Sequence, residues 1–180
     1  MRTKKATTRN LLPHHLKLIK GSGIKDEVAE ARGYRSITKP ATLSRLGFSE
    51  KQAALVPALL HPIWDVFGEN TRAQSRPDNP RLRDEKPIRY ENVPKMGVAL
   101  DVNPLARERV LAPRDDLFIT EGIRKGDSLA SRGLAAIALL GVWNWRGTDK
   151  SGALTALADW EKVSLKGRTV NIIFDSDVIT

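Results

Sequence analysis

The chain has 180 residues, with 30 Lys and Arg against 21 Asp and Glu, and therefore a formal net charge of +9. Its length suits one domain or one domain with a smaller appendage, and its 41% hydrophobic and 28% charged residues exclude a disordered or collagen-like chain. The sequence has no cysteine, which excludes a disulfide framework, a thiolate zinc site and a cysteine nucleophile. No apolar run approaches the ~20 residues of a transmembrane helix, so we expect a cytoplasmic protein without membrane partners.

The charge is unevenly distributed along the chain. Residues 116–180 carry eight basic and eight acidic side chains, so the whole positive excess lies in residues 1–115. Such asymmetry is typical of a chain in which one half binds a polyanion such as nucleic acid. An ordinary solvated basic surface remains the alternative on charge alone.

The first part of the chain predicts a small basic α+β subdomain over residues 11–115. Residues 1–10 are polar and basic and predict a disordered arm. From Leu11 to about Leu55 the spacing of apolar residues indicates helices. Residues 56–65 are apolar but rich in proline, which favours a strand, and residues 70–95 contain four prolines that favour short strands and loops.

The last part, residues 116–180, predicts an α/β fold. Three continuous apolar runs alternate with helix-compatible segments, a pattern typical of a mostly parallel sheet with helices covering both faces. The strands are expected at 117–120, 135–140 and 170–174, and the helices at 121–133 and 153–162.

Acidic residues follow two of these predicted strands. Glu121 comes after the first strand, and Asp175 and Asp177 come after the third. Ligands of open α/β sheets bind outside the carboxyl ends of the strands, and three carboxylates converge there if the two strands are neighbours. An oxygen-only ligand set favours Mg²⁺ or Mn²⁺. The alternative is that these residues only cap helices, since Glu121 would favour a helix N-terminus.

Other side chains suggest contacts with a nucleotide or nucleic acid. Lys125, one helical turn after Glu121, would neutralise a phosphate or would simply be a solvated helix residue. Trp143 and Trp145 alternate with Arg146 just beyond a strand end, where aromatic rings stack on bases, although core packing is the usual role of tryptophan.

The three histidines give no metal motif. His14 and His15 are adjacent, so we expect them on different faces of a helix as surface residues rather than as metal ligands. His61 stands alone in the sequence, and we expect a structural role for it.

Several segments together resemble a Toprim domain, the metal-dependent module of bacterial-type primases, of type IA and type II topoisomerases and of some nucleases. Its signature is a Glu-Gly after the first strand and an Asp-x-Asp after a later one, which Glu121-Gly122 and Asp175-Ser176-Asp177 match. The helix around Asp127-Ser128-Leu129 and the strand end at Ala138–Gly141 agree in order and context. The resemblance implies that Glu121, Asp175 and Asp177 are the catalytic, metal-binding residues.

The upstream part resembles the region that precedes the Toprim domain in bacterial DnaG-type replicative primases. Residues 61–68, 74–76 and 89–92 match three phrases of that region in the same order. The resemblance implies contacts of Arg76 and Arg89 with nucleotide or template, with Arg81 and Lys86 as neighbours. The chain also looks like Toprim-like plasmid and phage proteins described as domains of unknown function, which share residues 76–81 and 141–145.

The resemblance as a whole implies primer synthesis from nucleoside triphosphates on single-stranded DNA, in the replication of a plasmid, phage or integrated element, with a replicative helicase as a further partner. Toprim folds continue with another helix and strand after the Asp-x-Asp, so we expect residues 116–180 to form an incomplete Toprim domain. Two alternatives remain open: a Toprim-type nuclease, and a non-catalytic nucleic-acid-binding module or truncated remnant.

Overall fold

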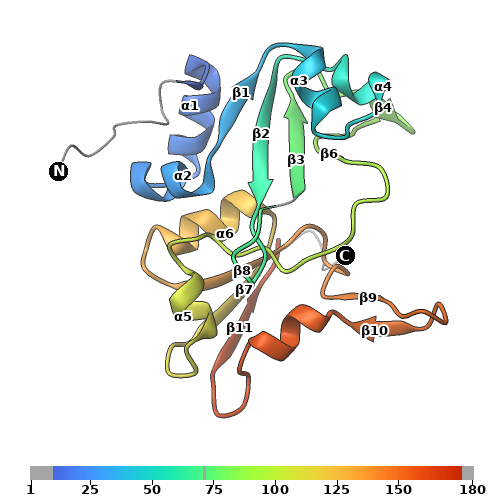
Figure 1. The fold of residues 1–180 in the computed structure, drawn as a ribbon. Coiled ribbons are helices and arrows are strands. Elements are labelled where there is room, and N and C mark those ends of the chain that lie inside the picture. Colours follow the sequence, from blue (N-terminus) through green and yellow to red (C-terminus); the bar gives the residue numbers. More distant parts are fainter. Residues whose placement is uncertain (1–9, 71, 176–180) are drawn as a thin grey trace.

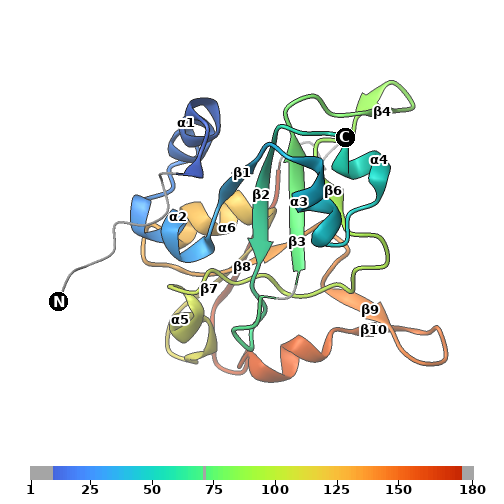
Figure 2. The same ribbon diagram turned by 45° about the horizontal axis from the view of Figure 1, so that its top comes forward.

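A computed structural model describes residues 10–70 and 72–175. The two larger of its four sheets organise its two parts, with an antiparallel sheet in the N-terminal part and a parallel sheet in the C-terminal part (Figure 1). Helix α6 lies between them, next to α2 (Figures 1 and 2). The predicted arm at residues 1–10 falls almost entirely outside the described residues.

The N-terminal part is an α+β unit, as the sequence predicts. Its four-stranded sheet has the order β1-β2-β3-β6, and every pair in it is antiparallel. Its elements are α1 (Pro13–Gly21), α2 (Asp26–Arg32), β1 (Arg35–Ile37), α3 (Pro40–Arg45), α4 (Glu50–Ala53), β2 (Ala58–Ile63), β3 (Arg72–Pro77), β4 (Leu82–Arg83), β5 (Lys86–Pro87) and β6 (Glu91–Asn92).

Local signals explain where the helices begin. Pro13 and Pro40 stand at the start of α1 and α3, where a missing N–H costs no helical hydrogen bond. Ser49 and Gln52 form a capping box at α4, in which each side chain bonds the other residue's backbone N–H. The prediction of helices throughout Leu11–Leu55 is wrong at β1, because its residues pair with β2, a long-range partner that local periodicity does not reveal.

The C-terminal part contains the predicted parallel sheet, with strand order β11-β7-β8. The predicted α/β fold class is confirmed. Its elements are α5 (Arg107–Leu111), β7 (Leu117–Glu121), α6 (Ile123–Ala130), β8 (Ala135–Leu139), β9 (Arg146–Thr148), β10 (Leu154–Ala156), the 3₁₀ helix η2 (Ala158–Lys162) and β11 (Val170–Ile173).

Two expectations for this part are wrong. Residues 153–162 are not one helix, because β10 pairs antiparallel with β9 and only η2 is helical. The side chain of Asp149 stabilises the hairpin turn by accepting the N–H groups of Ser151 and Ala153. Within the described part of the chain the sheet is also not covered on both faces at β11, where Ile172 is 65% exposed. Hairpin β9–β10 and η2 border a cavity over this face instead of covering it.

The larger hydrophobic core joins the two parts of the chain. It contains Ile19 and Val28 from the N-terminal helices together with Leu117 and Ile137 from the parallel sheet. A smaller core, which includes Leu43, lies among α3, α4 and the antiparallel sheet. Shared burial therefore holds the two sheets together, while the division at residue 115 stays a prediction. None of the described helices combines the length and the apolar character that a membrane crossing needs.

Candidate functional site

The turn after β7 places Glu121 at the carboxyl end of the parallel sheet. Glu121 is the last residue of β7 and pairs with Leu139 of β8. Gly122 follows with φ of 84° and ψ of 138°, and its N–H donates to the Leu139 carbonyl at 2.7 Å. Glycine alone adopts this conformation without strain. The Glu-Gly pair therefore lets the chain turn sharply into α6 and leaves Glu121 at the sheet edge.

Asp175 reaches the same edge from the neighbouring strand. β11 runs parallel to β7, with Ile173 beside Thr120. Asp175 lies two residues beyond Ile173, and it lines with Glu121 a cavity of about 320 Å³. The structure thus brings two of the three predicted carboxylates together, and the third, Asp177, lies outside the described residues.

The first turn of α6 contributes a cation to this cavity. Lys125 Nζ lies 2.5 Å from Asp175 Oδ2, in an ion pair whose side chains are 44% and 56% exposed. Because both groups are solvated, the pair contributes little to stability. The ion pair matters for the electrostatics of the cavity, because it places a positive charge beside Asp175. Glu121 directly precedes Gly122, the N-cap of α6, and no side-chain hydrogen bond caps the start of this helix, so an effect of Glu121 on the helix would be electrostatic only.

The N-terminal part supplies the opposite wall of the cavity. Arg89 and Tyr90, between β5 and β6, line it together with Arg124 of α6. Arg124 donates hydrogen bonds to the Tyr90 hydroxyl at 3.1 Å and to Ser22 Oγ at 2.9 Å. These bonds fix its guanidinium between the two sheets. Three cations and two carboxylates therefore meet in a cavity suited to a phosphate ester with its metal ion.

Sequence reasoning missed Arg124 and Tyr90 as members of this cavity. Arg124 stands two residues after Gly122, so its place at the start of α6 was a signal available in the sequence. Tyr90 offered none of its own, because its role depends on the packing of the two sheets.

The other predicted basic residues do not line this cavity. Arg76 lies on β3 opposite Leu59, with a buried Nε that has no hydrogen-bond partner among the described residues. Arg81 forms a two-bond ion pair with Glu91, at 2.5 and 2.9 Å. Lys86 is exposed on the β4–β5 hairpin.

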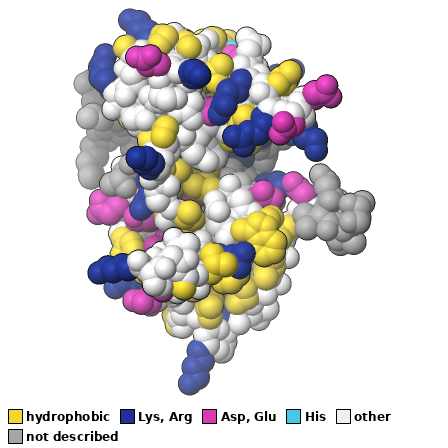
Figure 3. All heavy atoms as spheres, turned by 90° about the vertical axis from the view of Figure 1, so that its right-hand side faces the viewer, with side chains coloured by type: hydrophobic (Ala, Val, Ile, Leu, Met, Phe, Trp, Pro, Cys, Tyr) yellow, Lys and Arg dark blue, Asp and Glu magenta, His cyan; other side chains and the backbone are white. Residues whose placement is uncertain are grey.

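The two predicted tryptophans belong to an exposed apolar surface. Trp143 is 66% and Trp145 39% exposed, and the Arg146 guanidinium lies over their rings, 5.0 and 5.4 Å from the centroids. Both rings line a cavity of about 680 Å³ with Ile172 and Phe174 of the uncovered sheet face. Figure 3 shows hydrophobic side chains gathered on the lower half of this side of the molecule. These tryptophans are therefore not buried core residues.

His14 and His15 do not point apart as expected. Both rings contact the carboxylate of Asp78, just after β3, and their centroids lie 4.2 Å apart. His15 is also buried, with 1% exposure, so the prediction of a surface residue is wrong for it. His14 and His15 lie in the first turn of α1, and the two carboxylate oxygens of Asp78 can each contact one of the rings. Adjacent side chains can therefore share this one partner.

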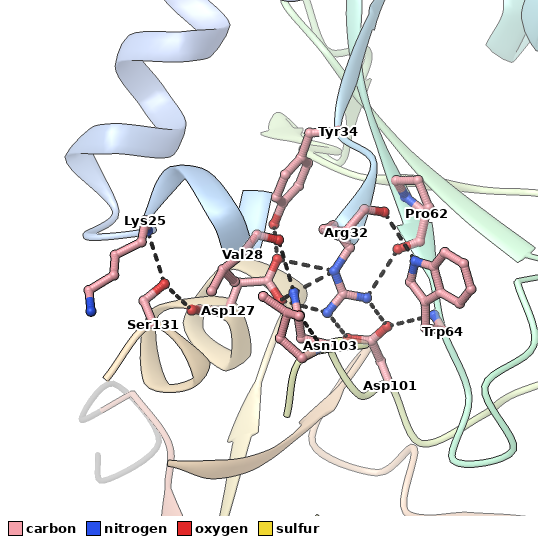
Figure 4. Close-up of polar contacts among 11 residues, drawn as sticks. Lys25, Val28, Arg32, Tyr34, Pro62, Trp64, Asp101, Asn103, Asp127 and Ser131 are labelled. Carbon is pink, nitrogen blue, oxygen red and sulfur yellow. Dashed lines mark hydrogen bonds and ion pairs between the residues drawn. The ribbon is translucent and has the colours of Figure 1, made fainter. Parts of the chain in front are cut away.

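A fully buried polar cluster connects the N-terminal part to α6 and lies beside the core (Figure 4). Arg32 of α2 forms ion pairs with Asp101 at 2.5 Å and with Asp127 of α6 at 2.6 Å. The Tyr34 hydroxyl and the Asn103 amide donate to the same Asp127 carboxylate, at 2.7 and 2.8 Å. Each charged group is thus satisfied by several partners, which a buried ion pair requires.

Burial and charge oppose each other in this cluster. Desolvation disfavours the charged form of Arg32, but the two adjacent carboxylates hold its pKa above the ordinary value. Burial raises the pKa of Asp101 to about 6, although Arg32 acts in the opposite direction. No local pattern predicts this cluster, because Asp101 and Asp127 lie 69 and 95 residues from Arg32 in the chain. It positions α6, and through α6 the cavity residues Arg124 and Lys125.

The fold is distantly similar to solved primase structures. The zinc-binding and RNA polymerase domains of the Aquifex aeolicus primase match with a TM-score of 0.59 and 18% identity, over 91% of this chain and 43% of that one. A DnaG primase catalytic domain bound to single-stranded DNA matches with a TM-score of 0.55 and 19% identity, over 93% and 56%. The catalytic core of E. coli primase matches with a TM-score of 0.53 and 18% identity, over 90% and 65%.

This chain therefore spans about half the length of these primase structures. No curated protein matches it significantly. Residues 110–180 match the model of a family described as a domain of unknown function, DUF3854. The predicted resemblance is confirmed: residues 110–180 match the DUF3854 model, and about nine-tenths of the chain is similar in fold to solved DnaG primase catalytic domains.

Proposed function

We propose that this protein catalyses metal-dependent nucleotidyl transfer of the primase kind, making primers on single-stranded DNA during replication of a plasmid, phage or integrated element. The observation that carries the proposal is the cavity of about 320 Å³ in which Glu121 and Asp175 meet Arg89, Arg124 and Lys125. The primase-like fold supports it, since one of the matching structures is a catalytic domain bound to single-stranded DNA.

The residues at the strand ends fit a hard divalent cation. Glu121 and Asp175 offer carboxylate oxygens without sulfur or imidazole in the cavity, and Mg²⁺ and Mn²⁺ prefer such a ligand set. The Lys125 ammonium already places a positive charge 2.5 Å from Asp175. When bound there, the cation would activate the attacking 3′-hydroxyl and stabilise charge on the triphosphate. Asp177 is proposed as a third ligand.

The chain's own residues would bind and orient the nucleotide. Arg124, fixed by Tyr90 and Ser22, would direct its guanidinium at a phosphate, and Arg89 would do so from the opposite sheet. Lys125, which pairs with Asp175, would add a further positive charge for a phosphate oxygen. Positioning of reactants and electrostatic stabilisation account for most of the catalysis in phosphoryl transfer. We therefore assign these two roles to Arg89, Arg124 and Lys125.

Template contacts are proposed for the remaining basic and aromatic side chains. Trp143 and Trp145 are exposed rings, and bases stack on such rings with little sequence preference. Arg146 lies over both and adds positive charge. The basic residues Arg76, Arg81 and Lys86 would follow the template backbone, and a replicative helicase is the further partner that we propose.

The proposal is tested by primer synthesis on single-stranded DNA with Mg²⁺ and nucleoside triphosphates. We expect Glu121→Gln and Asp175→Asn each to reduce synthesis at least a hundredfold, because each removes a carboxylate from the proposed cation site. The matched control is Asp116→Asn, an exposed carboxylate at the opposite end of β7, which should keep full synthesis. Synthesis that survives in both cavity variants would overturn the proposal.

One observation favours a second candidate, a nucleic-acid-binding module without catalysis. The Lys125–Asp175 ion pair neutralises part of the cavity without any metal ion. Such a module would bind single-stranded DNA equally well with and without Mg²⁺ and would make no primers. Titration of DNA binding with Mg²⁺ therefore separates the two functions.

A further inference from the structure

A group of metal-ligating side chains lies outside the strand-end cavity, where α1 meets the end of β3. His14 Nε2 lies 2.8 Å from Asp78 Oδ2, and His15 Nε2 lies 2.7 Å from Asp78 Oδ1. One ligand atom from each residue can be chosen so that all three lie within 4.8 Å of one another. The proposed primase chemistry does not use these residues.

We propose that His14, His15 and Asp78 bind a divalent transition-metal ion of the zinc class. Two imidazole nitrogens and one carboxylate oxygen form a ligand set that Zn²⁺ and its neighbours accept, whereas Mg²⁺ prefers oxygen alone. Three protein ligands leave a fourth position for water. The site thus differs in chemistry from the cavity at Glu121 and Asp175.

The hydrogen bonds around His15 orient it as a ligand. His15 Nδ1 lies 2.7 Å from Ser36 Oγ, and the same oxygen accepts the Leu12 N–H at 2.7 Å. A hydroxyl oxygen has two lone pairs, so it can accept from both groups. The His15–Asp78 hydrogen bond needs a proton on Nε2, because a carboxylate only accepts. A metal ion would replace that proton, and Nδ1–H would then donate to Ser36 Oγ, an outer hydrogen bond of the kind that holds metal-binding histidines in general.

The group has the freedom to open around an ion. With metal bonds of about 2.0–2.2 Å, tetrahedral ligand atoms lie roughly 3.4 Å apart, so the present contacts must widen by roughly half an ångström. The His14 and Asp78 side chains are 56% and 22% exposed and can move, while His15 is fixed at 1% exposure.

A bound ion would join three elements of the N-terminal part. His14 and His15 belong to α1, Asp78 follows β3, and Ser36 of β1 holds His15. The ion would fix α1 against the antiparallel sheet, so we expect binding to raise the unfolding temperature.

The test uses the full chain without a histidine tag, stripped of metal by a chelator and titrated with Co²⁺ and then Zn²⁺. We expect the intense visible absorption of four-coordinate Co²⁺, which an oxygen-only site at Glu121 and Asp175 would not give, to saturate at one ion per chain and to be removed by Zn²⁺. His14→Ala and, separately, Asp78→Asn should weaken binding at least tenfold, and Zn²⁺ should no longer raise their unfolding temperatures. His14 is exposed, so its variant is expected to fold.

Two control variants keep the sites apart. Glu121→Gln removes a carboxylate of the strand-end cavity, and Asp84→Asn removes an exposed carboxylate next to β4, so both should bind Co²⁺ as tightly as the unchanged chain. Unchanged Co²⁺ affinity in His14→Ala and Asp78→Asn, or loss of binding in Glu121→Gln, would overturn the proposal. So would failure of the unchanged chain to bind Co²⁺ at all.

Discussion

His61 is a buried base that the fold keeps uncharged. It lies on β2 between the rings of Tyr34 and Tyr90, with centroid distances of 5.2 and 5.6 Å, and neither ring nitrogen has a hydrogen-bond partner among the described residues. Burial, together with the charges of Arg124, Arg32 and Arg76, lowers its pKa to about 3. The neutral ring therefore packs as an aromatic side chain in the core, which agrees with the structural role predicted for it.

This shift makes the free energy of unfolding depend on pH. Between pH 6.5 and about 3 the unfolded chain binds a proton at His61 that the folded chain excludes, so stability is lost as the pH falls through this window. We expect His61→Phe, which keeps the ring packing and removes the proton site, to reduce the slope by up to about 1.4 kcal/mol per pH unit. Urea unfolding from pH 4.5 to 7 measures the two slopes.

Comparing the slopes isolates His61 from the other buried groups. Asp101, with its pKa raised to about 6, acts in the opposite direction, because its folded form favours the protonated carboxyl and loses stability as the pH rises toward 6. That contribution is the same in both proteins and cancels in the comparison. Equal slopes for the two proteins would contradict the account of His61.

Helix α6 is the element that positions the candidate site, and its distance from β8 depends on Gly126. A Cβ at Gly126 would lie 2.9 Å from the Cβ of Ala138 on β8, so either the helix or the strand must shift. Arg124 and Lys125 are adjacent to Gly126 on this helix. The small residue thus allows the close packing that places both cations at the cavity.

We expect Gly126→Ala to destabilise the protein. Overpacking costs about 1–3 kcal/mol, and alanine returns about 1 kcal/mol of helix propensity. The matched control is Gly21→Ala at the end of α1, where a Cβ meets nothing within 4 Å, and it should be neutral or stabilising. Urea unfolding gives both values, and a Gly126→Ala protein as stable as Gly21→Ala would refute the packing account.

Patterns of neighbouring residues predicted the strands that are continuous apolar runs. The apolar runs at β7, β8 and β11 identified the parallel strands, and the position of Glu121 and Asp175 after two of them suggested that they meet. Elements with long-range partners were missed, as β1 was, because its pairing with β2 leaves no periodic signal. The role of Arg124 and the common partner of His14 and His15 depend in the same way on how the two sheets and α1 pack.

At the scale of the whole molecule, the two parts of the chain supply opposite walls of one cavity, and two of its three cations, Arg124 and Lys125, come from the part whose net charge is zero. The basic N-terminal part contributes Arg89, and the neutral C-terminal part contributes Glu121 and Asp175. The buried cluster around Arg32 and the shared core hold these walls in place. A nucleotide bound between these two walls would contact both parts of the fold, so the proposed catalysis requires both parts.

The central claim is that this cavity binds a nucleoside triphosphate together with a divalent cation. The most direct measurement is calorimetric binding of a nucleoside triphosphate to the full chain, with and without Mg²⁺, in the unchanged protein and in Glu121→Gln, Arg89→Ala and Asp116→Asn. The account predicts that Mg²⁺ tightens binding at least tenfold in the unchanged protein and in Asp116→Asn. It predicts little effect of Mg²⁺ in Glu121→Gln and weaker binding under both conditions in Arg89→Ala. Equal affinity with and without Mg²⁺ in the unchanged protein would contradict it.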